Sequence, residues 1–229
     1  MTVRSYRDGT RNYELKGGNQ GSTDAQGVSL EIYIHALYGL ALQRAQKILI
    51  IGCASGSLAT MLARAGRDVT LVDIDPAAFK LAQRYFHLAP EVACHVGDGL
   101  AFLRKSRVKY DALILDAFIG EAIPDHFTGA TFYESARKCV KRAGMVLVNV
   151  CLHDRKDPLA DEIARGFKAR GWPVKLLDEP GTARNALVLA GDIAGLRKPG
   201  VTLPPGAGAA KLRKGVAAMK FRAPTTARS

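Results

Sequence analysis

The sequence has no long apolar run and few cysteines. Its longest apolar stretches, at residues 48–54 and 145–152, hold about eight residues, whereas a membrane-spanning helix needs roughly 18 or more. We therefore expect no membrane span. The first eight residues contain no apolar segment typical of a secretory signal. The four cysteines form no C-x-x-C pair, and no two of the five histidines have metal-ligand spacing. These absences argue against disulfides and a bound metal, and they favour a cytoplasmic protein.

Acidic residues are absent from the C-terminal segment, residues 195–229. Eight of the 33 Lys and Arg lie there, so the rest of the chain accounts for only +4 of the net charge of +12. The same segment holds five Gly and four Pro and has no sustained apolar period. We expect residues 193–229 to be a basic, mostly disordered tail. Such tails are usually solvated extensions, and we expect nucleic acid to bind, if at all, only through this one.

The body of the chain alternates short apolar strands with helices. Four expected strands are nearly continuous runs of Ile, Leu and Val, at residues 47–51, 68–72, 110–115 and 145–151. Runs of this kind are typical of a parallel sheet that is buried on both faces. Short connections to the intervening helices predict a doubly wound, Rossmann-like α/β sheet, closed by two antiparallel strands at 174–177 and 186–190.

Three regions follow from this pattern. Residues 1–27 hold five Gly and one short strand-like segment, and we expect an N-terminal arm or hairpin there. Residues 28–192 are expected to form a nucleoside-binding α/β domain, beginning with a helix at 28–43. The basic tail at 193–229 completes the chain.

Two strand ends carry residues suited to a nucleoside. In open α/β sheets, ligands bind beyond the carboxyl ends of the strands. The first strand is followed by G-C-A-S-G-S at residues 52–57, where small residues let backbone N–H groups approach a ligand at a helix N-terminus. Asp73 closes the second strand 17 residues after Gly56, near the spacing of an acid that binds ribose hydroxyls. Asp75 precedes a proline and is expected to cap the next helix. The alternative is that residues 52–57 form only a tight strand-to-helix turn and bind no ligand.

Two further acids follow later strands. Asp98 lies between Gly97 and Gly99, where a carboxylate could accept an adenine amino group or simply cap a helix. Asp116 follows the run Ala112–Leu115 and should lie at the rim of an apolar cleft. Loss of water there would raise its basicity, as a general base requires, although a structural capping role stays open.

These motifs resemble, in register, those of the spermidine synthase family, which are polyamine aminopropyltransferases with the class I methyltransferase fold. The resemblance covers residues 28–152 and depends on I-L-I-I-G-C-A-S-G-S from Ile48, L-V-D-I-D-P from Leu71, V-G-D-G from Val96 and Y-D-A-L-I-L-D-A-F from Tyr110. It implies an amine acceptor, a homodimer, and decarboxylated S-adenosylmethionine as the co-substrate.

The resemblance also implies roles for individual residues. The nucleoside loop would be Gly52, Ala54, Ser55 and Gly56, and Asp73 with Ile74 would bind the ribose. Asp98 with Gly99 would bind the adenine, and Asp116 would be the general base. The implied substrate-binding positions are Gln20, Tyr33 and Ile119.

Two departures from the family pattern concern charge. Ser55 and Ile119 stand where aminopropyltransferases typically carry Asp. These acids contact cationic amines, and the acid in the loop would also repel the carboxylate of S-adenosylmethionine. Glu121 and Asp125 are near enough in sequence to replace a lost acid. Three functions therefore stay open: aminopropyl transfer, methyl transfer from S-adenosylmethionine, and non-catalytic nucleoside binding with nucleic acid on the tail.

Overall fold

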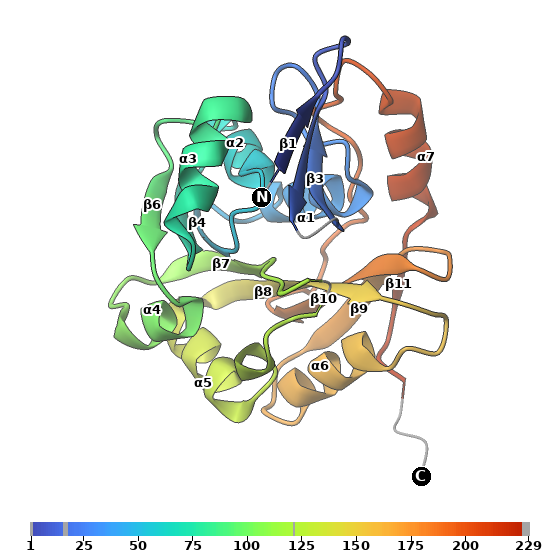
Figure 1. Ribbon diagram of the computed structural model, residues 1–229. Helices are drawn as coiled ribbons and strands as arrows, with labels where there is room; N and C mark the ends of the chain where they lie inside the picture. The colour runs from blue at the N-terminus through green and yellow to red at the C-terminus, as the bar shows by residue number, and fades with distance from the viewer. Residues whose placement is uncertain (1, 16–17, 121, 226–229) are drawn as a thin grey trace.

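The computed structural model describes residues 2–15, 18–120 and 122–225, and its centre is an eight-stranded sheet (Figure 1). The strand order is β11-β9-β10-β8-β7-β4-β5-β6. The strands are β4 Lys47–Ile51, β5 Asp68–Asp73, β6 Ala93–Val96, β7 Tyr110–Leu115, β8 Val140–Leu152, β9 Val174–Asp178, β10 Arg184–Gly191 and β11 Lys220–Arg222. Five neighbouring strands, β6, β5, β4, β7 and β8, are parallel. Beyond β8 the sheet continues through β10, β9 and β11, and each of these pairs antiparallel with its neighbour.

Helices cover both faces of this sheet. On one face lie α1 Ile32–Leu42, α2 Ser57–Arg64, α3 Pro76–Tyr85 and α7 Ala209–Ala218. On the other lie α4 Gly99–Lys105, α5 Ala130–Cys139 and α6 Leu159–Lys168, with a short 3-10 helix, η1 Asp125–Phe127, before α5. Each face has its own apolar cluster, so the strands are buried on both sides. The predicted doubly wound α/β fold is confirmed.

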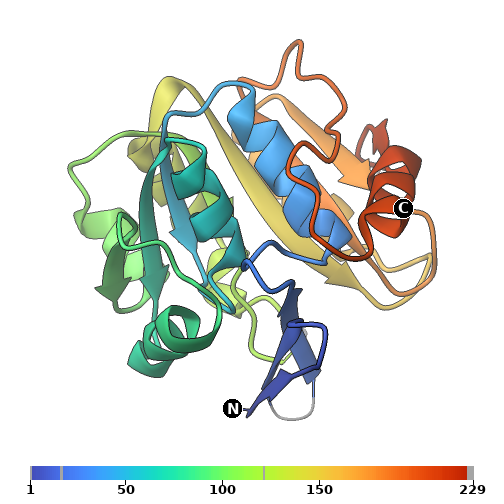
Figure 2. The same ribbon diagram turned by 90° about the horizontal axis from the view of Figure 1, so that it is seen from above.

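The N-terminal residues form a small antiparallel sheet that stands apart from the main one (Figure 2). Its strands are β1 Thr2–Ser5, β2 Arg11–Leu15 and β3 Gly18–Thr23, and we call residues 2–23 the arm. The Leu30 amide donates to the Ser22 carbonyl at 2.8 Å, so the chain before α1 pairs with the arm. For this reason α1 begins at Ile32 and not at Val28, as the sequence had suggested.

The C-terminal segment differs from the expected disordered tail. It contributes α7, which packs against α1, and β11, which pairs with β9. Leu212, Val216 and Met219 are buried, and a Cβ on Gly215 would lie 2.4 Å from the Ile32 side chain. Helix α1 is apolar on nearly all sides because the sheet covers one side and α7 another. The apolar residues of α7 and β11 are too few to form a recognisable helix or strand period, so the sequence alone does not predict that this segment is ordered.

Polar contacts anchor the end of the described chain. The Arg222 guanidinium pairs with Asp161 and with Asp178, each at 2.8 Å. The Thr225 amide donates to the same Asp161 carboxylate at 2.6 Å. Among the helices of the described residues, none combines the length and the apolar character that a bilayer crossing requires.

Candidate active site

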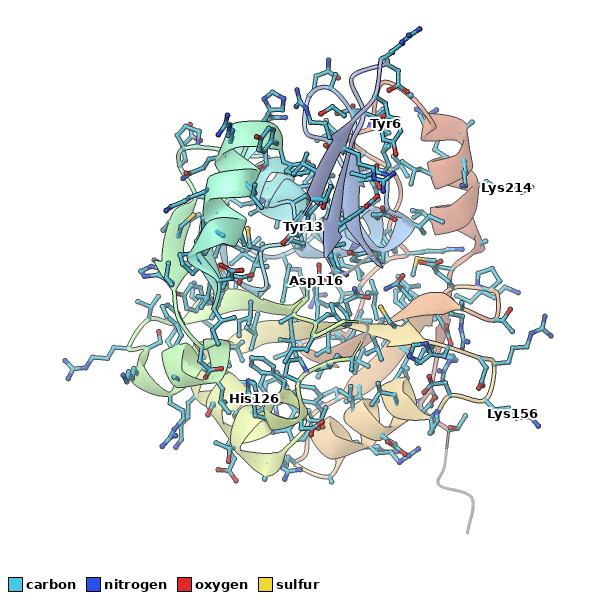
Figure 3. All side chains as sticks on the ribbon, in the orientation of Figure 1. Tyr6, Tyr13, Asp116, His126, Lys156 and Lys214 are labelled. Atoms are coloured by element: carbon cyan, nitrogen blue, oxygen red, sulfur yellow. The ribbon has the colours of Figure 1, made fainter. Side chains whose placement is uncertain are left out.

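A cleft of about 430 Å³ opens at the carboxyl ends of β4, β5 and β7, and residues of the arm form part of its wall. Asp116 lies between the arm, which carries Tyr13, and the main sheet (Figure 3). The position agrees with the rule that ligands bind beyond the carboxyl ends of parallel strands. The walls include residues from the arm, from four strand ends and from the segment after β7, among them Tyr13, Gln20, Glu31, Tyr33, Ile74, Asp116, Phe118, Ile119, His126 and Asn149.

The segment after β4, residues 52–57, is a tight turn that we call the glycine loop. Gly52 has φ +103°, and a Cβ there would lie 2.1 Å from the carbonyl oxygen of Asp116. Only glycine allows the ends of β4 and β7 to approach so closely. Gly52, Cys53 and Ala54 line the cleft. The N–H groups of Gly52 and Cys53 already donate to the Val72 carbonyl and to Asp73, so these two residues offer a ligand a surface and not N–H donors.

Ser55 and Gly56 lie deeper than the rest of the glycine loop. Ser55 is only 2% exposed, its hydroxyl donates to Ser57 at 3.2 Å, and Gly21 of the arm lies directly against it. Ser55 and Gly56 line a small adjoining cavity of about 10 Å³, which is water-sized, and not the main cleft. These two implied nucleoside contacts thus lie behind the cleft wall.

Asp73 ties the glycine loop to the next strand end. Its two carboxylate oxygens accept the backbone N–H groups of Cys53 at 2.7 Å and of Asp75 at 2.8 Å. Asp75 caps α3 through the Ala77 amide, as the sequence predicted. Each Asp73 oxygen keeps a second acceptor position, because an ionised carboxylate has about four. Asp73 lines the cleft beside Ile74, whose side chain is 72% exposed.

Asp98 performs the capping role that the sequence left open. Its Oδ1 accepts the Ala101 amide at 2.8 Å at the start of α4, and its Oδ2 lies 3.1 Å from His126 Nε2. Asp98, Gly99 and His126 all line the cleft. Capping and a ligand contact are therefore compatible. His126, from the segment after β7, is a further residue of the cleft wall.

Asp116 lines both the cleft and the small adjoining cavity, directly after β7. Burial raises the pKa of its carboxyl to about 6, in spite of a hydrogen bond from Asn149 that lowers it; nearby Glu31 raises it further. Asn149 Nδ2 donates to Asp116 Oδ1 at 2.7 Å. A carboxyl with this pKa is a stronger base than an ordinary aspartate and is still mostly ionised at neutral pH.

Two other acids lie on this side of the site, Glu31 within electrostatic range of Asp116 and Glu179 within range of Glu31. Glu31 precedes α1 and lines the cleft, and Glu179 follows β9. Burial raises the pKa of Glu179 to about 7, and both Asp178 and Glu31 raise it further. Burial also holds the pKa of Tyr33 well above its usual value, with Asp116, Glu31 and Glu179 adding to the effect. Sequence reasoning missed both glutamates, because neither lies in a recognisable motif.

The other positions named from the sequence fall in different places. Gln20 and Tyr33 lie in the wall of the cleft, as does Ile119, which is 70% exposed. Pro124 and His126, in the segment between β7 and α5, also line the cleft. Asp125 between them is exposed and does not line it. Glu121 is outside the described residues. In the described part of the chain, no group of three His, Cys, Asp or Glu side chains is arranged to hold a metal ion.

A family model of the spermine/spermidine synthase domain matches residues 31–158. The chain belongs to this family. Among curated spermine/spermidine synthase relatives, a polyamine aminopropyltransferase of Vibrio vulnificus is 32% identical over 111 residues, which are 45% of this chain and 37% of that protein. An N-terminal histidine N-methyltransferase of Emericella nidulans is 31% identical over 106 residues, 44% of this chain and 19% of that protein. The matches thus span well under half the length of these relatives.

Solved structures agree on the fold of this spermine/spermidine synthase family member. A probable spermidine synthase from Corynebacterium glutamicum has a TM-score of 0.75 at 16% identity and covers 98% of this chain and 93% of that chain. A spermidine synthase in complex with the transition state analogue AdoDATO has a TM-score of 0.58 at 14% identity, covering 86% and 74%. At these identities the likeness shows the fold alone.

Proposed function

We propose that this protein transfers an aminopropyl group from decarboxylated S-adenosylmethionine to a di- or polyamine, with Asp116 as the general base. The observation that carries the proposal is the position of Asp116. It is a partly buried carboxylate of raised pKa in the wall of a large cleft, next to the glycine loop. Membership in the spermine/spermidine synthase family supports the reaction class.

The nucleoside would occupy the part of the cleft beside the glycine loop. Its ribose hydroxyls would donate to the remaining acceptor positions of Asp73, and its adenine amino group would donate to Asp98. Exposed Ile74 and the Gly99 backbone would pack against the adenine ring. Burial of this apolar surface would supply much of the affinity.

The reaction needs one proton acceptor and one leaving group. An amine nitrogen attacks the aminopropyl carbon bonded to the sulfonium, and the carbon–sulfur bond breaks. The bonding electron pair stays on sulfur, which gives neutral methylthioadenosine. The proton displaced from the attacking nitrogen moves to Asp116. Alignment of the two substrates in the cleft supplies a large part of the acceleration.

The acceptor would bind on the side of the cleft that Glu31 occupies. Ser55 and Ile119 provide no charge where other aminopropyltransferases typically carry Asp, and Ser55 lies outside the cleft. Glu31 is in the cleft wall and close enough to Asp116 to raise its pKa. A substrate ammonium near these carboxylates would be attracted to both. We propose that Glu31 takes over the role of the missing acids.

Product analysis tests the proposal directly. The protein is incubated with decarboxylated S-adenosylmethionine and with putrescine, cadaverine or spermidine, and methylthioadenosine is quantified by chromatography. We expect amine-dependent release with at least one acceptor. No release above an Asp116→Asn control with any of the amines would contradict the proposal.

A parallel calorimetric titration compares the two sulfonium nucleosides. We expect decarboxylated S-adenosylmethionine to bind more tightly than S-adenosylmethionine, because the acids near the cleft repel an added carboxylate. The reverse order, with S-adenosylhomocysteine as the product, would instead support methyl transfer.

A further inference from the structure

Two asparagines and Asp116 form a row across three neighbouring strands. Leu115 of β7 is paired with Val148 of β8, so Asp116 and Asn149 occupy adjacent positions. Side chains alternate along a strand, and Ile114, Leu147 and Leu187 all point into the apolar cluster beneath α1. Asp116, Asn149 and Asn185 continue the same alternation to the end of the sheet. An apolar face thus ends in three polar side chains.

The hydrogen bonds along this row all run in one direction. Asn185 Nδ2 donates to Asn149 Oδ1 at 2.9 Å, and Asn149 Nδ2 donates to Asp116 Oδ1 at 2.7 Å. Asn149 is only 1% exposed, and a buried amide is costly unless it is hydrogen-bonded. Because Asn185 occupies its carbonyl oxygen, Asn149 must turn its NH₂ group toward the carboxylate. A flipped amide would place an oxygen against the negative charge.

We infer that Asn149, oriented by Asn185, is a positioning residue that holds Asp116 Oδ1 and leaves Oδ2 as the oxygen that accepts the substrate proton. This inference depends on the proposed function, in which Asp116 is the base. A carboxylate fixed at one oxygen loses the freedom to rotate away from the attacking nitrogen. Its orientation is then established before the substrate binds.

The charges around Asp116 oppose the effect of Asn149. Glu31, before α1, raises the pKa of Asp116, and the hydrogen bond from Asn149 lowers it. Tyr33 of α1 and Cys151 of β8 also line this part of the cleft, and Glu179 lies within electrostatic range of Tyr33. Tyr33 has a pKa well above its usual value, so it is neutral where Asp116 titrates. Loss of the Asn149 N–H should therefore leave burial, the largest cause, and Glu31 unopposed, and the pKa of Asp116 should rise.

The test uses Asn149→Leu, which keeps side-chain size but removes the donor. The protein is labelled with ¹³C at aspartate carboxyls, and the Asp116 signal is assigned by its loss in Asp116→Asn. We expect the titration midpoint of Asp116 to rise by roughly 0.5–1.5 pH units, because a hydrogen bond to the charged form favours that form. Turnover should fall 10- to 100-fold and KM for the nucleoside should change less than threefold. Asn12→Leu, on β2 of the arm and outside the cleft wall, is the matched control and should leave the midpoint unchanged.

A second variant keeps the inference falsifiable if Asn149→Leu fails to fold. Asn185 is half-buried, and Asn185→Leu removes the donor that orients Asn149, together with a weaker contact to Cys151 Sγ at 3.5 Å, and leaves the Asn149 donor in place. We expect a smaller rise of the midpoint in the same direction. An unchanged midpoint and unchanged turnover in a folded variant would overturn the inference while leaving the proposed function intact. If the midpoint shifts in the variants but the wild-type protein releases no methylthioadenosine with any amine, the proposed function is contradicted and the hydrogen-bond effect on Asp116 is not.

Discussion

At the scale of single residues, Asp116 has the largest expected effect on activity. Asp116→Asn keeps the shape of the side chain and its hydrogen-bond acceptor toward Asn149, but removes the base. We expect turnover to fall by roughly 10²–10⁴, the usual contribution of a general base, while the nucleoside Kd changes only a few-fold. Stopped assays of methylthioadenosine release and calorimetry measure the two quantities. Equal turnover in the variant and the wild type would exclude Asp116 as the base.

The raised pKa of Asp116 also predicts how stability depends on pH. Its folded-state pKa of about 6 lies above the usual aspartate value of 3.8, so the folded protein binds the proton more tightly than the unfolded chain. Folding is therefore favoured at low pH, and this contribution is lost as pH rises through about 6. Asp116→Asn should be more stable than the wild type at pH 7.5 by roughly 1–3 kcal/mol.

Chemical denaturation of both proteins at pH 7.5 and pH 4.5 measures this difference. At pH 4.5 the wild-type carboxyl is protonated in the folded state, so most of the difference should disappear. If the variant is less stable than the wild type at both pH values, the Asp116 carboxylate stabilises the fold, and the expected free-energy cost of burying its charge is contradicted.

Glu31 should affect the acceptor more than the nucleoside. Glu31→Gln removes one negative charge from the cleft wall without changing its shape. We expect KM for a diamine to rise by roughly 5- to 50-fold, since charged contacts contribute about 1–3 kcal/mol. KM for the nucleoside should stay within twofold. Glu134→Gln, on the exposed face of α5, is the matched control, and an equal effect there would refute the proposed role of Glu31.

At the scale of elements, the glycine loop is the part of the site with the strictest backbone requirement. Gly52→Ala would place a methyl group 2.1 Å from the Asp116 carbonyl oxygen at φ +103°, so β4 and β7 would have to separate. We expect loss of nucleoside binding and a Tm at least 10 °C lower, because overpacking and backbone strain each cost roughly 1–3 kcal/mol.

Gly66→Ala is the control for this prediction. Gly66 has φ +74°, so it shares the backbone strain, but a Cβ there would meet no atom within 4 Å. We expect a loss of only about 1 kcal/mol and unchanged nucleoside binding. Similar behaviour of the two variants would mean that strain alone, and not contact between the strand ends, explains the need for Gly52.

At the scale of the whole molecule, the C-terminal segment is a structural part of the domain. Leu212 of α7 is buried at 3% exposure, so Leu212→Ala should destabilise the protein by roughly 2–5 kcal/mol. Lys214→Ala, on the exposed side of the same helix, should change stability by less than about 0.5 kcal/mol. Urea unfolding compares the two variants. Equal stability of both would contradict the packing of α7 on α1.

The same packing determines how nucleic acid binding through this segment must be tested. Truncation at residue 194 would expose α1. A change in nucleic acid affinity could then come from unfolding as well as from the loss of basic residues. Combined substitution of exposed Lys211, Arg213 and Lys214 by Gln removes charge without removing the core contacts. If this segment binds polyanions, RNA affinity and its salt dependence should both decrease in the folded triple variant. Unchanged affinity would exclude these three residues.

The sequence by itself determined the α/β fold, the glycine loop, the capping role of Asp75 and the position of Asp116 at a strand end. Strands and turns of this kind depend on local patterns, because apolar runs must be buried and left-handed turns favour glycine. These features involve residues that are close together in the chain.

Only the tertiary structure decided which distant residues meet at the cleft and what covers α1. Glu31, Asn149 and Asn185 come from three separate parts of the chain, and sheet pairing alone brings Asn149 beside Asp116 and Asn185 beside Asn149. The order of the C-terminal segment likewise depends on contacts with α1 and β9, far away in sequence. Such contacts depend on burial and register across the whole sheet, which no local pattern of residues records.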